Sequence, residues 1–124
     1  MKNIGWTSGI LWLIGSYNKK KRGRTMEFTL EQARDVAVQL GIDFSTKGYT
    51  LEEFAFGMNV ELEHGTADPF TNVTNDDPIV TGKIALAHLN EVPMYYNEKI
   101  GLEVWEHLLE HLPADAPRNG IEIV

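Results

Sequence analysis

Two short segments carry histidine and glutamate at helical spacing. Glu61 precedes His64 by three residues, and His88 precedes Glu91 by three. Residues three apart lie on neighbouring parts of one helical face, so each pair converges, and antiparallel packing of two helices would turn the pairs toward each other. Two imidazoles and two carboxylates suit zinc, iron or manganese. The pattern therefore predicts that these four side chains bind one divalent metal ion. A dinuclear centre would need further inward-facing glutamates, which the sequence does not supply.

Two further side chains are expected in the shell around that ion, Tyr95 and Asp77. Tyr95 follows His88 by seven residues and lies near the same helical face. His88 itself falls on an apolar stripe, where an unpaired imidazole costs about 1–3 kcal/mol, so it must have a partner. A purely structural alternative stays open. In that alternative His88 bonds Glu61, Tyr95 or a backbone carbonyl, and His64 caps the carbonyl end of its helix.

Other histidines and acids give weaker signals. Glu103, His107 and His111 are spaced four apart beside further glutamates, which indicates a solvated helical face more than a metal site. The loop 68–77 is rich in side-chain oxygens but lacks the order of acids and the final glutamate of an EF-hand. Asp, Asn and Thr in such a loop favour turn formation.

Capping and stop signals predict the helices that must position these side chains. Thr29 and Thr50 each begin a capping box, Thr-x-x-Gln and Thr-x-x-Glu. The first helix is expected to stop at Gly41 and the second near Gly65. Asp77 followed by a proline suits the start of a third helix.

A proline divides the second half of the chain. Pro93 disfavours helical geometry at the residue before it, so the third helix should end near Glu91 and a fourth should continue to roughly His111. No strong alternation of period two appears. The predicted fold class is all-α, a compact bundle of about four helices with an apolar-basic N-terminal extension.

Charge divides the chain into unequal parts. The whole sequence of 124 residues has no cysteine, which excludes disulfides, thiolate metal sites and cysteine nucleophiles. Its formal charge is −7, but residues 1–25 carry six bases and no acid, leaving 5 bases against 18 acids afterwards. The predicted organisation is an extension over 1–25, a helical domain over 26–112 and a tail over 113–124. The acidic body is not expected to bind nucleic acid.

The extension has an amphipathic pattern. Trp6, Ile10, Leu13 and Tyr17 recur at helical spacing, but the apolar run is too short and too rich in glycine to span a bilayer. Its bases follow the apolar run, unlike those of a secretory signal, so the protein is expected in the cytoplasm. The segment is a candidate contact for a membrane surface or a protein partner through Trp6, Trp12, Lys19, Lys20, Lys21, Arg22 and Arg24. Alternatively, Met26 is the natural start.

Several blocks between residues 26 and 100 occur in an order shared with a known family. They include Phe28–Ala33, Leu40–Asp43, Val60-Glu-Leu-Glu-His-Gly65, Thr74–Asp77, Thr81-Gly-Lys-Ile-Ala-Leu-Ala-His-Leu89 and Glu91-x-Pro-x-Tyr-Tyr96. The sequence thereby resembles a family of small bacterial and phage proteins catalogued only as a domain of unknown function. The resemblance implies a compact helical domain with Glu61, His64, His88, Glu91 and Tyr95 in its signature. It implies no activity.

Three functional classes follow from these observations. The first is a metal-binding helical domain. The second is a non-catalytic assembly or interaction module, phage-associated or a virion component, which associates with a protein partner or with itself and keeps the Glu/His cluster as a buried structural feature. The third, an enzyme, has the least support because the sequence shows no complete catalytic set.

Overall fold

All the regular secondary structure in the described part of the chain is helical. The structure is a computed structural model that describes residues 27–113 and 115. These residues form four α-helices, two 3-10 helices and no strand: α2 (Leu30–Leu40), η1 (Phe44–Thr46), α3 (Leu51–Glu61), η2 (Leu62–His64), α4 (Pro78–Glu91) and α5 (Leu102–Glu110). The predicted all-α class is confirmed. None of these helices combines the length and apolar composition needed to cross a bilayer. The contacts predicted for residues 1–25, Trp6 to Arg24, lie outside the described residues.

The predicted caps begin the first three helices. Thr29 and Thr50 each accept a hydrogen bond from the backbone N–H three residues on, and the side chain at that position bonds back to the threonine N–H. The Asp77 side chain accepts from the Val80 N–H at the start of α4. Gly41 ends α2 with φ of 71°, a left-handed conformation that glycine adopts without strain.

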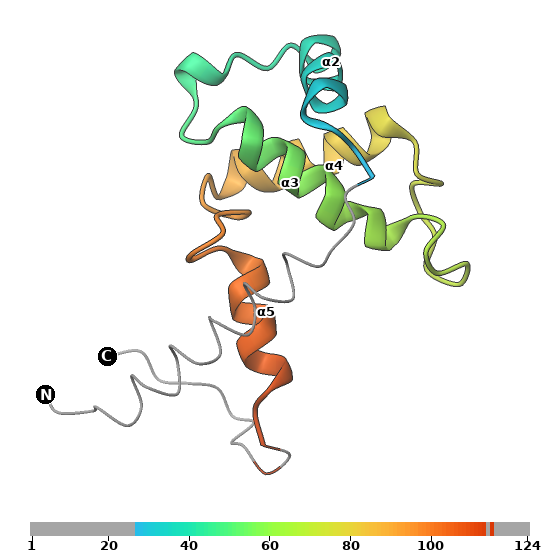
Figure 1. The fold of residues 1–124 in the computed structure, drawn as a ribbon, viewed down its shortest axis with the longest axis vertical. Helices are drawn as coiled ribbons and strands as arrows, with labels where there is room; N and C mark the ends of the chain where they lie inside the picture. The colour runs from blue at the N-terminus through green and yellow to red at the C-terminus, as the bar shows by residue number, and fades with distance from the viewer. Residues whose placement is uncertain (1–26, 114, 116–124) are drawn as a thin grey trace, which may run out of the picture.

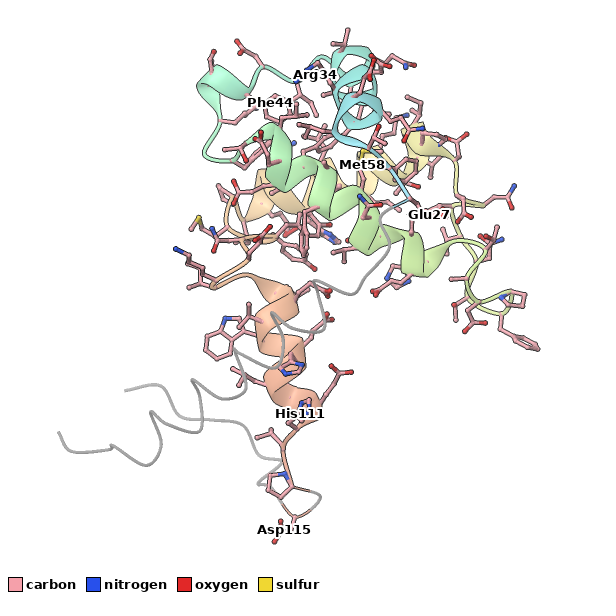
Figure 2. All side chains as sticks on the ribbon, viewed as in Figure 1. Glu27, Arg34, Phe44, Met58, His111 and Asp115 are labelled. Atoms are coloured by element: carbon pink, nitrogen blue, oxygen red, sulfur yellow. The ribbon has the colours of Figure 1, made fainter. Side chains whose placement is uncertain are left out.

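Helices α2, α3 and α4 pack on one another around a single apolar core (Figure 1). A Cβ added to Gly82 on α4 would lie 2.5 Å from a methyl group of Val36 on α2, so this glycine allows the two helices to approach closely. Met58 on α3, labelled in Figure 2, is fully buried between the helices. The buried apolar side chains are Phe28, Ala33, Val36, Ala37, Tyr49, Phe54, Ala55, Phe56, Met58, Val60, Ala85, Leu89 and Tyr96.

The described chain enters this body beside the C-terminal half of α3. The Asn59 side-chain oxygen accepts hydrogen bonds from the backbone N–H groups of Glu27 and Phe28, each at 2.9 Å. The Asn59 amide nitrogen donates in turn to the Phe28 carbonyl at 3.1 Å. Glu27 therefore lies next to α3, as Figure 2 shows.

The fourth helix begins later than predicted. Residues 92–101 form turns, and α5 starts only at Leu102 and extends away from the three-helix body (Figure 1). The Asn97 side chain accepts from the N–H groups of Lys99 and Ile100 at 2.9 and 3.1 Å, which stabilises a turn in place of a helix. Gly101 completes this turn, because a Cβ there would lie 2.5 Å from the Asn97 carbonyl oxygen.

Candidate functional site

A small pocket lies where the end of α3, the second half of α4, the 92–101 turn and α5 meet. Its volume is about 90 Å³, room for several waters or a partly hydrated ion and far less than an organic cofactor needs. It is lined by Val60, Glu61, Glu63, His64, His88, Tyr95, Tyr96, Leu102, Glu103 and Glu106. Four of these side chains are carboxylic acids, two are imidazoles and none is a lysine or arginine.

The buried carboxylate of Glu61 is the centre of the hydrogen bonding at this pocket. Its Oε1 accepts a hydrogen bond from the Tyr96 hydroxyl and lies 3.1 Å from Nδ1 of His88. The same His88 Nδ1 lies 2.8 Å from the Tyr96 hydroxyl oxygen. An ionised carboxylate only accepts, so this arrangement requires the proton of a neutral His88 on Nδ1. The lone pair is then on Nε2, away from Glu61.

The two adjacent tyrosines have different roles. Tyr95 was one of the candidate partners of His88, and its ring stacks on the imidazole, with centroids 4.2 Å apart and planes 17° from parallel. Tyr96 makes the hydroxyl contact and is almost fully buried. Burial, followed by the hydrogen bond to Glu61, raises the pKa of Tyr96 well above its ordinary value, so the phenol stays protonated.

A glycine in the middle of α3 makes room for Tyr96. A Cβ on Gly57 would lie 2.5 Å from two ring carbons of Tyr96. Glycine inside a helix costs about 1 kcal/mol relative to alanine, so its presence here is a sequence signal for a close neighbour. Sequence reasoning assigned Tyr96 no role in the site, although this glycine was available to indicate one.

His64 is at the pocket but is not fixed there. The second helix ends as α-helix at Glu61, and His64 falls on the 3-10 turn that follows. Its Nε2 lies 3.2 Å from a Glu63 carboxylate oxygen and 3.9 Å from one of Glu61. Its side chain is 51% exposed, so it can change rotamer at low cost.

Glu91 and Asp77 lie outside the pocket. Glu91 is the last residue of α4 and is exposed, and it is not among the lining residues. Asp77 caps the opposite end of α4, about 16 Å along the helix from His88 at 1.5 Å per residue. Among residues 27–113 and 115, no three His, Asp or Glu side chains are grouped so that they could hold a metal ion as they stand.

Helix α5 contributes two acids that sequence reasoning placed on a solvated face. Glu103 and Glu106, one helical turn apart, both line the pocket. The hydrogen bond with Glu103, followed by burial, raises the pKa of Glu106 to about 7. The same prediction of a solvated face is wrong for His107, which is only 5% exposed.

The loop between η2 and α4 forms turns, as predicted. Asp76 accepts hydrogen bonds from both the backbone N–H and the hydroxyl of Thr66, and these lower the pKa of its carboxyl group. Asp68 accepts from the Phe70 N–H at 3.0 Å. The side-chain oxygens of the loop therefore hold its own backbone.

Comparison with known proteins gives one match. No curated protein and no solved structure matches the chain. A family model described as "Protein of unknown function (DUF5661)" matches residues 33–107, which is more than half of the chain. The match includes α3, α4, the 92–101 turn and every residue that lines the pocket. The chain therefore belongs to the DUF5661 family, and the pocket lies wholly within the family domain.

Proposed function

We propose that the pocket binds a divalent metal ion. The observation that carries this proposal is its lining, with four carboxylic acids and two imidazoles around a small volume and no lysine or arginine among them. Like charges crowded at one place repel each other, and a bound cation relieves that repulsion. Nitrogen and oxygen donors together suit zinc, iron or manganese.

His88 is the proposed principal ligand. Its Nδ1 lies 3.1 Å from the Glu61 carboxylate, which leaves the lone pair of Nε2 for a metal. A histidine that binds metal through one nitrogen commonly donates the other N–H to a carboxylate, which fixes the ring and raises its basicity. In this proposal Glu61 orients His88 and is not itself a ligand, unlike in the sequence prediction.

The remaining donors must move to complete the site. His64 is half-exposed on a short turn, and Glu106 extends from the exposed helix α5. Rotation of these two side chains toward Nε2 of His88 would supply one nitrogen and one oxygen ligand. Water would occupy the other positions. Because the site is assembled on binding, we expect weaker affinity than at a preformed structural zinc site.

Untagged protein provides the test. Metal content is measured by elemental analysis, and Zn²⁺, Mn²⁺ and Fe²⁺ are each titrated calorimetrically into chelator-treated protein. We expect one ion per chain and at least tenfold weaker binding in His88→Gln. His111→Gln is the matched control, because His111 follows α5 at the end far from the body (Figure 2) and does not line the pocket. An equal change of metal affinity in the two variants, or no binding heat with any of the three ions, would refute the proposal.

One observation favours the second candidate, an interaction module whose Glu/His cluster is structural. Glu61 Oε1 already faces two partners inside the protein, Tyr96 and His88, so the buried carboxylate needs no ion. Under this candidate a chelator leaves thermal stability unchanged, and replacing His88 lowers stability without changing any affinity for metal.

A further inference from the structure

Helix α5 has an exposed apolar stripe on the side away from its buried residues. Val104 and His107 are buried. Four apolar side chains at helical spacing are exposed to different degrees: Leu102, which also lines the pocket, at 37%, Trp105 at 59%, Leu109 at 60% and Leu112, just past the helix, at 50%. A helix that packs on one side normally presents polar residues on the other, so a second apolar face marks a contact surface.

An acidic stripe runs beside the apolar one. Glu103, Glu106 and Glu110 recur at intervals of three and four residues, and α5 contains no lysine or arginine. At 100° per residue their mean direction falls roughly 115° around the helix from the apolar stripe. Glu103 and Glu106 also line the pocket, so the acidic stripe is on the pocket side of α5. A segment that covers this face must combine apolar residues with bases near them.

We infer that residues 4–17 of the same chain dock on the exposed apolar stripe of α5, with the basic run Lys19–Arg24 beside its glutamates. Trp6, Ile10, Leu13 and Tyr17 recur at intervals of three and four residues, which matches the spacing of the stripe on α5. The five bases of the run follow Tyr17 after one residue, Asn18. The apolar residues of the segment therefore match the stripe in spacing, and the bases after them are opposite in charge to the glutamates of α5.

The chain has the length to make this contact. Glu27 bonds Asn59, and the next residue on α3, Val60, lines the same pocket as Leu102 and Glu103 of α5. The described chain thus begins beside α3, the helix whose C-terminal end lines the pocket together with α5. Residues 18–26 span up to roughly 30 Å when extended, more than twice the length of a nine-residue helix. This contact is independent of whether the pocket binds a metal.

Cross-linking of the full chain tests the contact, because the sequence has no native cysteine to interfere. Leu109→Cys is combined with Ile10→Cys or with Leu13→Cys, since the segment can run in either direction along α5. A short bis-maleimide is added to dilute protein, and the products are identified by mass spectrometry. The control pair replaces Leu109→Cys by Val38→Cys, an exposed apolar position on α2, in the opposite part of the body from α5 (Figure 1).

At least one Leu109 pair is expected to link within a single chain at least fivefold faster than the Val38 pair. Ile10→Asp combined with Leu13→Cys should abolish that excess, whereas Ser8→Asp, on the opposite side of the segment, should preserve it. Equal rates for the Leu109 and Val38 pairs would overturn the inference. Cross-links that form only between two chains would overturn it as well and would assign the stripe to a second copy of the protein.

Discussion

Replacing Tyr96 by phenylalanine tests whether the hydrogen bonds around Glu61 hold the fold together. The side chains of both residues are almost inaccessible, with Tyr96 1% and Glu61 3% exposed. The substitution removes the hydroxyl that donates to the carboxylate but leaves the ring packed against Gly57. A hydrogen bond to a charged group contributes about 1.5–3 kcal/mol, and Glu61 keeps its contact with His88. We therefore expect Tyr96→Phe to lower the free energy of unfolding by about 2 kcal/mol.

Two other tyrosines calibrate that value. The Tyr49 hydroxyl donates to the uncharged side chain of Asn90 at 3.1 Å, so Tyr49→Phe should cost about 1 kcal/mol. Tyr95 contacts His88 through the face of its ring, so Tyr95→Phe should cost less than about 0.5 kcal/mol. Each of the three variants removes one phenolic hydroxyl, and only the surroundings of that hydroxyl differ.

Urea unfolding followed by far-UV circular dichroism, in the presence of a chelator, measures all three variants. The midpoint of Tyr96→Phe should fall with an unchanged slope, and its melting temperature should fall by about 10 °C, since 1 kcal/mol corresponds to about 4–8 °C in a domain of this size. If Tyr96→Phe loses no more stability than Tyr95→Phe, the carboxylate at the pocket does not depend on this hydroxyl and the account of the site is wrong.

Three further substitutions have expected outcomes that the same unfolding measurements check. Gly57→Ala should cost about 2 kcal/mol despite the better helix propensity of alanine, because the added Cβ would lie 2.5 Å from the Tyr96 ring; a gain in stability would contradict that close packing. Asn59→Ala should cost about 3 kcal/mol, since it leaves the backbone N–H groups before α2 without their acceptor; a cost below about 1 kcal/mol would mean that water replaces the amide. The pKa of Glu106, raised from 4.5 to about 7, means that the folded protein holds more protons than the unfolded chain between these values, so stability should fall as pH rises from about 4.5 to 7. Because Glu106 is largely exposed, the change should stay within about 1 kcal/mol, and Glu106→Gln should flatten the profile; identical profiles would show that the pKa of Glu106 is not raised.

Helix boundaries were predictable where local chemistry sets them. Each cap of the first three helices depends on residues within four positions of one another, and the structure has all three where the sequence indicates them. The start of α5 has local and distant causes. The Asn97 side chain stabilises the preceding turn locally. The contact of Tyr96 with Gly57 on α3 joins residues far apart in the sequence, and no local pattern expresses it.

The same distinction between local and distant contacts explains which residues of the site were predictable. Helical spacing correctly indicated that Glu61 and His88 belong together, and their atoms lie 3.1 Å apart. Spacing places Glu91 near the face of His88, but α4 ends at Glu91, as Pro93 predicts, and the Glu91 side chain is exposed there. Glu106 is exposed, as predicted, but its place in the lining of the pocket depends on how α5 packs, which the sequence of α5 alone does not determine.

The attachment of α5 has a kinetic consequence for the pocket. Two of the acids that line the pocket belong to α5, which extends away from the three-helix body and joins it through the 92–101 turn (Figure 1). Elements with few buried contacts open locally at a lower free energy than the core around them, and their backbone amides exchange with solvent sooner. Amides of α5 should therefore exchange well before those of α3 and α4. The pocket therefore has a lifetime set by the docking of this one helix.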